Sequence, residues 1–194
     1  MGASVPEQLE QWLPQPAIRV THRARSDAGP GELWDAARAL TLAQSPVLGR
    51  LVQWRIPGTQ RELSFDRLLH EPPFLVLAEG ERWLLSGLVG RIWTLRRDYP
   101  VLDDPESFRE FSERGSARVA IAVWSEPESP GGALCAEARV EGLGAQGQLG
   151  VAAVRPLVRA FQHLIGTEAL RAAARRAEAG RPGGVKIAPR AALP

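Results

Sequence analysis

The chain has 194 residues, a length that suits one domain around a single core. Hydrophobic residues make up 44% of it and charged residues 24%, which is ordinary globular usage and excludes a disordered chain. The formal net charge is only +2. Because so small a surplus forms no basic stripe along the sequence, we exclude nucleic acid as a main partner.

The cysteine content and the N-terminal residues indicate in which cellular compartment the protein is expected. Cys135 is the only cysteine, so there is no internal disulfide and no thiolate metal cluster. The first sixteen residues carry Glu7, Glu10 and three prolines where a signal peptide needs an unbroken apolar stretch. The longest apolar stretch, residues 83–93, is interrupted by a serine and an arginine and is too short to span a bilayer. The sequence therefore predicts a cytoplasmic protein with no stable membrane insertion.

The N-terminal third contains an arm, a strand and two helices. Residues 1–15 are polar, contain proline and show no sustained period, so we predict a flexible N-terminal arm. Apolar and polar residues then alternate over residues 17–25, which is typical of a strand with one solvated face. Turn and capping residues follow, and helical spacing predicts a helix beginning near Pro30 and a second short helix around residues 47–54.

The rest of the chain contains two hairpins and a long helix. Alternation and turn residues predict the first hairpin at residues 74–79 and 82–95 and the second at residues 116–126 and 133–141. A polar excursion with a short helix near residues 107–111 separates them. The apolar stripe after the second hairpin predicts a helix to about Glu178. Residues 180–194 are rich in proline, glycine and arginine, so we predict a disordered tail.

These elements predict the α+β class, with a single domain over residues 16–179. Each strand has one apolar face that must be covered. The C-terminal helix is the only predicted element long enough to cover it. We therefore expect a curved antiparallel sheet wrapped around a long C-terminal helix, with two short helices after the first strand. Space left between such a sheet and its helix could hold a ligand.

Several packing motifs resemble a known superfamily. They lie at residues 74–79 (FLVLAE), 85–93 (LSGLVGRIW), 108–111 (FREF), 136–140 (AEARV) and 161–177. Together with the element order, they resemble the helix-grip fold of the SRPBCC superfamily, which includes START lipid-transfer domains, polyketide cyclases and the major birch pollen allergen. More locally they are similar to a bacterial branch with no assigned function. The chain departs from that branch at Ala138, where threonine is usual, and at Gln162-His163, where an aromatic pair is common.

His22 and Arg91 are the candidate polar residues of such a cavity. By alternation, His22 shares a face with apolar neighbours and should point inward, where a neutral imidazole could orient a ligand or move a proton. The alternative is a hydrogen-bonded core histidine. Arg91 points inward if Trp83 and Trp93 do, and a buried guanidinium needs a carboxylate, either from the protein as a structural ion pair or from a ligand acid.

Three functions are compatible with this interpretation. The first is binding of a hydrophobic small molecule, lipid or polyketide-like, between the sheet and the C-terminal helix. The second is an enzyme of the cyclase or dehydratase kind, with His22 as the candidate catalytic residue. The third is a filled core that acts as a protein-interaction module. The expected ligand-binding residues are His22, Trp83, Arg91, Trp93, Val119, Ile121 and Phe161. The sequence predicts no metal and no cofactor, and it leaves the oligomeric state open.

Two further patterns receive structural interpretations. Residues 142–147 match GxGxxG, but no second strand follows the helix, so a dinucleotide-binding βαβ unit is excluded in favour of a flexible connection between hairpin and helix. Glu137 and Arg139 fall on the polar side of their strand. We therefore expect them to form cross-strand ion pairs on a solvated face.

Overall fold

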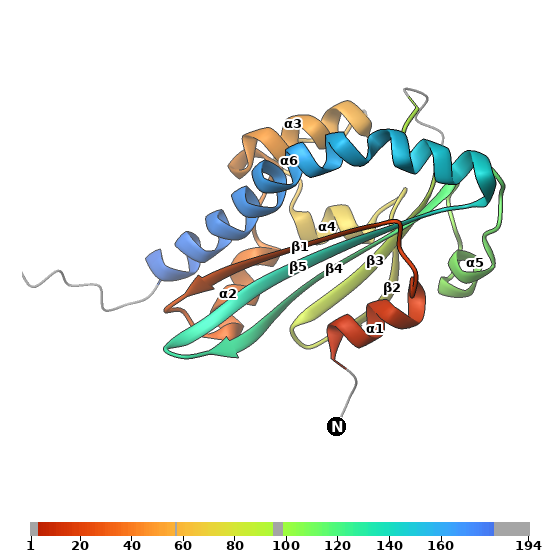
Figure 1. Cartoon of the computed structure of the whole chain (residues 1–194). Helices are drawn as coiled ribbons and strands as arrows, with labels where there is room; N and C mark the ends of the chain where they lie inside the picture. Colours follow the sequence, from red (N-terminus) through yellow and green to blue (C-terminus); the bar gives the residue numbers. More distant parts are fainter. Residues whose placement is uncertain (1–3, 57, 95–98, 181–194) are drawn as a thin grey trace, which may run out of the picture.

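The computed structural model describes residues 4–56, 58–94 and 99–180, with their side chains except at residues 157–166. Within these ranges, five strands form one sheet in the order β1-β5-β4-β3-β2, and every neighbouring pair is antiparallel (Figure 1). The strands are β1 (Ile18–Ser26), β2 (Leu75–Gly80), β3 (Trp83–Gly90), β4 (Ala117–Glu128) and β5 (Gly131–Gly142). The predicted α+β class is confirmed.

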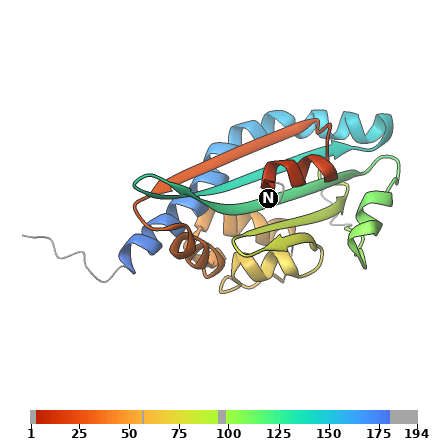
Figure 2. The ribbon, with the colours of Figure 1, turned by 90° about the horizontal axis from the view of Figure 1, so that it is seen from below.

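Helices cover both faces of the sheet. They are α1 (Val5–Trp12), α2 (Pro30–Arg38), the 3-10 turn η1 (Leu42–Gln44), α3 (Pro46–Arg55), α4 (Phe65–His70), α5 (Pro105–Glu110) and α6 (Gly144–Ala179). The long helix α6 lies over one face together with α2, whereas α1 lies against the other (Figures 1 and 2). The two predicted short helices after the first strand are confirmed as α2 and α3. Most of the predicted tail lies outside the described residues.

Strand register assigns the side chains to the two faces. His22 stands opposite Ala136, which stands opposite Val123, and these three side chains face α6. One residue further along each strand, Arg23, Cys135 and Trp124 form a row on the other face, which we call the α1 face. The predicted alternation of β1 is confirmed, because its arginines are exposed while Ile18 and Ala24 are buried.

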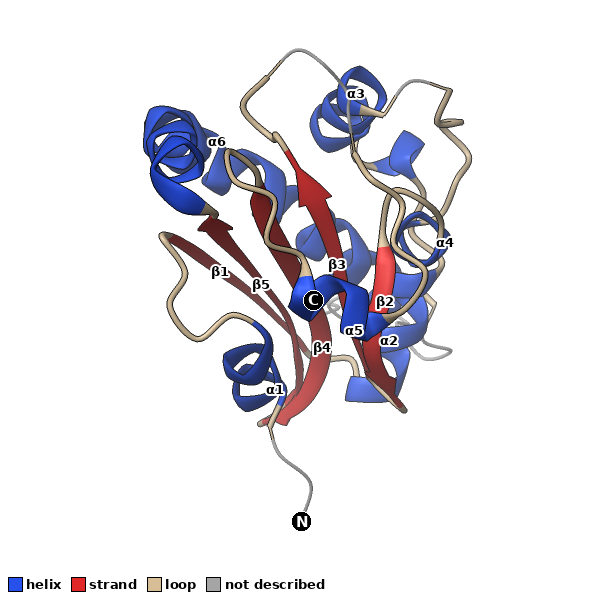
Figure 3. Ribbon diagram, turned by 90° about the vertical axis from the view of Figure 1, so that its right-hand side faces the viewer, coloured by secondary structure: helices blue, strands red, loops and turns tan. Residues whose placement is uncertain are grey.

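The prediction of a flexible arm over residues 1–15 is wrong for residues 5–13, because α1 is part of the core. Leu9 and Leu13 are fully buried, and Trp12 packs edge-on against Phe108 of α5 with ring centroids 6.0 Å apart. The Glu7 carboxylate accepts a hydrogen bond of 2.7 Å from the Ser4 N–H and so caps the helix. Figure 3 shows α1 beside the sheet, on the side away from α6.

The second strand of the first hairpin is shorter than predicted. β3 ends at Gly90 rather than at residue 95, and Gly90 has φ +137°. That conformation favours glycine and takes the chain out of the sheet. The next residues form a turn in which Thr94 N–H donates to the Arg91 carbonyl at 3.1 Å. Arg91 therefore does not continue the alternation of β3.

The GxGxxG segment packs the start of α6 against the sheet. A Cβ on Gly147 would lie 2.4 Å from the Ser116 carbonyl oxygen, and Gly144 has φ +67°. These glycines permit close backbone approach and a turn. The expected structural role is confirmed, but the connection is tight rather than flexible.

We expect Gly147→Ala to lower the free energy of unfolding by about 1–3 kcal/mol, because the added methyl meets backbone that cannot rotate away. Gly31→Ala is the matched control, since nothing lies within 4 Å of a Cβ there. This control should be neutral or stabilising by up to about 1 kcal/mol, because alanine favours helix. Urea unfolding of both variants measures the difference, and equal effects would contradict the close-packing role.

Candidate functional site

The middle of the sheet face under α6 is partly exposed. Two rows of side chains cross β1, β5 and β4 there, and all six members are only half-buried. We call them the central patch: Val20, Ala138 and Ile121 in one row, and His22, Ala136 and Val123 in the next. The rows on either side of the patch are buried. They are Ile18, Val140 and Val119 toward the start of α6, and Ala24, Leu134 and Ser125 toward its end.

On the opposite face, the middle residues of β4 and β5 are buried, whereas Arg19, Thr21 and Arg23 of the edge strand β1 are exposed. Directly behind the central patch, Ala120, Ala122, Glu137 and Arg139 are at most 2% exposed. A small apolar side chain on an inner strand normally loses its contact with water when a helix covers it. On β4 and β5, the central patch therefore stays partly exposed although α6 crosses this face, whereas the side chains directly behind it are buried.

The core packing shows the same asymmetry. On the α1 face, one continuous cluster joins α1, α5 and the strands. On the α6 face, the described apolar side chains form separate clusters: one around Val151 near the start of α6, one around Leu170 near its end, and one around Trp34 and Leu84. Members of the central patch lie at the margins of these clusters rather than inside one.

The structure brings four of the predicted ligand-binding residues together. His22 and Ile121 belong to the central patch, and Val119 is buried in the adjacent row. Trp93 packs on the same cluster as Val119, half-buried against Gly150 of α6. The side chain of Phe161 lies outside the described residues.

Two of the predicted residues lie elsewhere. Trp83 pairs with Trp124 and packs on the α1 face, opposite to His22. The expectation that Arg91 points inward is wrong, because β3 ends at Gly90 and the Arg91 side chain is 52% exposed. Its guanidinium lies 3.5 Å from the Glu113 carboxylate. Arg91 thus belongs to the surface of the turn.

Arg55 of α3 holds this turn in place, a role that no sequence motif indicates. Its guanidinium donates to the Thr94 carbonyl at 2.7 Å, to the Ile92 carbonyl at 3.1 Å and to the Tyr99 hydroxyl. It also stacks over the rings of Trp54 and Tyr99. Arg55 therefore ties α3 to the segment that carries Trp93, at the margin of the α6 face.

A buried ion-pair network lies on the α1 face, where Glu137 and Arg139 are buried rather than solvated as predicted. The Arg139 guanidinium lies 2.7 Å from the Glu137 carboxylate and 2.6 Å from that of Glu10, and it donates to the Leu13 carbonyl at 2.9 Å. Arg19 contacts Glu137 at 2.9 Å. α1 covers the pair, which explains why alternation alone misplaced it in solvent.

Hydrogen bonding decides the charge state of Glu137. Burial alone would raise its pKa, but hydrogen bonds from Arg139 and Arg19 outweigh burial, and the pKa lies below its usual value. Burial would likewise lower the pKa of Arg139, yet its bonds to Glu137 and Glu10 raise it. Both groups are ionised near neutral pH, so they act as a structural network and not as an acid and base.

The thiol of Cys135 is unsuited to nucleophilic chemistry. It is 2% exposed, and burial, together with the nearby Glu126 charge, raises its pKa to about 11. A thiol with so high a pKa carries almost no thiolate near neutral pH. Within the described ranges, no group of three or more His, Cys, Asp or Glu side chains could hold a metal ion. In the same ranges, no helix is both long and apolar enough to cross a bilayer.

Comparison with known proteins shows no family. No family model matches the chain, and no curated protein matches it. A solved structure, that of TTHA0849 from Thermus thermophilus, aligns with a TM-score of 0.37 and 12% identity over 84% of this chain and 98% of that one. We draw no argument from a similarity of that size.

Proposed function

We propose that the chain is a helix-grip domain of the SRPBCC kind that binds a hydrophobic small molecule between its sheet and α6. The single observation that carries this proposal is the part of the central patch on the inner strands β4 and β5. Its apolar side chains stay partly exposed beneath a helix, while Ala120, Ala122, Glu137 and Arg139 directly behind them are buried. A filled core, which would make the chain a protein-interaction module, would bury these positions as fully as the rows beside them.

The chemistry of the patch indicates the class of ligand. Five of its six side chains are aliphatic, and His22 is the single polar member. Such a surface gains free energy by removing apolar area of a ligand from water, at roughly 25 cal/mol per Å². One imidazole can orient a ligand by a hydrogen bond to a carbonyl or hydroxyl group. We therefore expect a mainly apolar molecule with a single polar group.

Ala138→Phe tests the proposal, because the ring would occupy the middle of the patch. With the neutral dye Nile red as the probe, we expect the variant to bind at least about tenfold more weakly than the wild type, since a bulky group replaces the ligand. Ala145→Phe, at an exposed position in the first turn of α6, is the matched control and should bind normally.

Stability supplies a second readout for the same pair of variants. If the patch faces open space, Ala138→Phe should change the free energy of unfolding by less than about 1 kcal/mol, whereas insertion into a filled core would cost about 1–3 kcal/mol. Mass spectrometry of the natively purified protein would identify any captured ligand. Unchanged dye affinity in Ala138→Phe, or a core-like stability loss, would contradict the proposal.

A second candidate function is that of a cyclase or dehydratase in which the His22 imidazole moves a proton. The position of His22 in the central patch favours testing it. His22→Gln keeps a polar side chain of similar size but cannot act as a general base near neutral pH. Once a ligand is identified, lost turnover with retained affinity would favour catalysis. Retained turnover would leave binding as the function.

A further inference from the structure

A depression on the surface is lined mainly by arginine. It lies between the second half of β1 and the last turns of α6, has a volume of about 500 Å³, and shares no lining residue with the central patch. Its lining residues are Arg23, Ala24, Arg25, Arg171, Ala174, Arg175 and Glu178. A volume of this size is within the range of pockets that take small molecules. In Figure 1 this end of α6 runs beside the end of β1.

The two arginines from β1 line the depression, but their guanidiniums are engaged with carboxylates of β4. Arg23 contacts Glu126 and also Glu128, the latter at 2.6 Å, and Arg25 contacts Glu128 at 2.5 Å. The hydrogen bonds of these carboxylates raise the pKa of Arg23. Arg23 and Arg25 are thus held in position by ion pairs.

The two arginines from α6 supply the surplus charge. Arg171 and Arg175 are exposed and stand one turn apart on α6, a spacing at which like charges repel each other. Within the described part of the chain, no carboxylate lies at ion-pair distance from either guanidinium. Glu178 accepts a hydrogen bond of 2.6 Å from the Ser26 hydroxyl. Counting Glu126 and Glu128, four guanidiniums stand against three carboxylates at this site.

We propose that this depression binds a phosphate group, held by Arg171 and Arg175 of α6. A guanidinium donates two parallel hydrogen bonds to phosphate oxygens, and such charge-assisted bonds are stronger than neutral ones. A bound phosphate also relieves the repulsion between Arg171 and Arg175. Because α6 ends near Gly180, its partial negative end opposes the anion, so the binding position lies toward Arg171.

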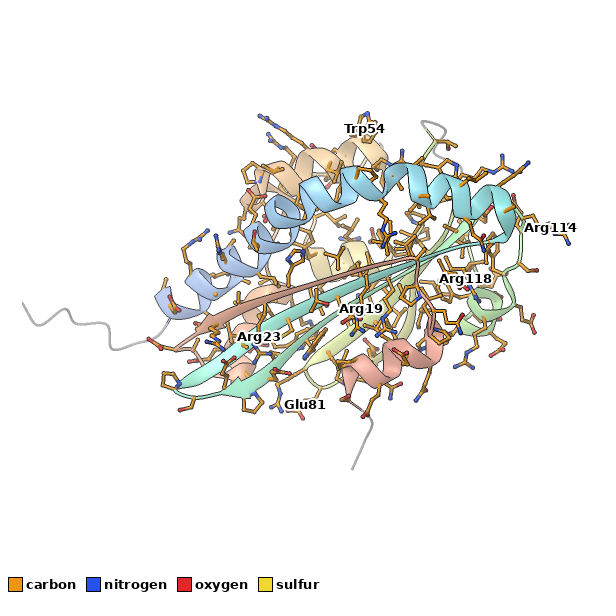
Figure 4. All side chains as sticks on the ribbon, viewed as in Figure 1. Arg19, Arg23, Trp54, Glu81, Arg114 and Arg118 are labelled. Atoms are coloured by element: carbon orange, nitrogen blue, oxygen red, sulfur yellow. The ribbon has the colours of Figure 1, made fainter. Side chains whose placement is uncertain are left out.

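The test is a titration of the full chain with inorganic phosphate, followed by calorimetry and by the ³¹P resonance. We expect saturable binding that weakens at least about tenfold in Arg171→Gln/Arg175→Gln, since each lost charged hydrogen bond removes that much or more. Arg171→Lys/Arg175→Lys keeps the charge but not the paired donors, and should fall in between. Arg114→Gln/Arg155→Gln removes the same charge at exposed positions outside the depression, and should bind as the wild type does. Figure 4 shows Arg114 and Arg23 at opposite ends of the molecule.

A second arm identifies the source of the phosphate. Vesicles containing phosphatidic acid are compared with vesicles of phosphatidylcholine alone. Binding to the former that depends on Arg171 and Arg175 supports a lipid headgroup, whereas binding of inorganic phosphate alone supports a free phosphorylated molecule. The proposal is overturned if neither probe binds saturably. It is also overturned if replacing Arg114 and Arg155 weakens phosphate binding as much as replacing Arg171 and Arg175 does. Since Nile red reports the central patch, its result is independent of this one.

Discussion

Replacing Arg139 with methionine is expected to lower the free energy of unfolding by about 3–5 kcal/mol, the usual cost of leaving a buried partner charge uncompensated. Arg139 is 1% exposed and holds Glu137, Glu10 and the Leu13 carbonyl. In the variant, the partners that Glu137 keeps among the described residues are Arg19 and the Thr21 hydroxyl. Chemical denaturation followed by tryptophan fluorescence measures the effect, since the chain has six tryptophans.

A matched substitution separates burial from loss of charge. Arg38→Met breaks the exposed pair with Asp66, at 2.9 Å, and should cost no more than about 1 kcal/mol. The double variant Arg139→Met/Glu137→Leu removes both buried charges and should recover much of the loss. If Arg139→Met cost no more than Arg38→Met, the buried network would have no structural role.

The network also sets a pH dependence. The pKa of Glu137 is lowered in the folded protein, so its ionised form stabilises the fold at pH values above the ordinary unfolded carboxyl pKa of about 4.3. That contribution is lost as the pH falls through the lower folded pKa. In Arg139→Met, Glu137 loses its main hydrogen-bond donor and its pKa should rise. We therefore expect the variant to lose less stability than the wild type on acidification.

Leu9→Ala is expected to cost about 2–5 kcal/mol, the range for truncating a buried leucine where the cavity cannot collapse. Leu9 is 0% exposed in the cluster that joins α1 to the sheet. Leu149→Ala makes the same change where the side chain is 70% exposed and should stay within about 0.5 kcal/mol. Equal values would mean that residues 1–15 are an arm after all.

The local sequence was sufficient to predict those helices and strands whose hydrophobic pattern and end residues lie within the element itself. The alternation over β1, the proline that begins α2 and the turn residues of the hairpins each predicted the observed element. The signal for α1 was also present, since Val5, Leu9 and Trp12 have helical spacing and Ser4 precedes Glu7 by three residues. It was missed because the segment is short and contains proline.

Contacts between distant segments could not be predicted in the same way. Alternation separates Glu137 and Arg139 from their apolar neighbours, but it does not show whether another layer covers the polar side. That layer is α1, which begins more than a hundred residues earlier. Likewise, the mainly apolar stretch to Trp93 gave no sign that the strand ends at Gly90, so Arg91 was expected to continue the alternation. Trp83 was assigned to the wrong face because β3 buries apolar side chains on both faces, Leu84 on one and Leu85 on the other.

The pairing of β1 with β5 has a consequence for synthesis on the ribosome. Arg139 and Glu10 are separated by 129 positions, so the N-terminal helix and the first strand emerge long before their partners exist. Completion of the sheet must await translation of its last hairpin, and contacts so distant in sequence are slow to form. Until then, the nascent chain presents the apolar stripe of its first helix to chaperones.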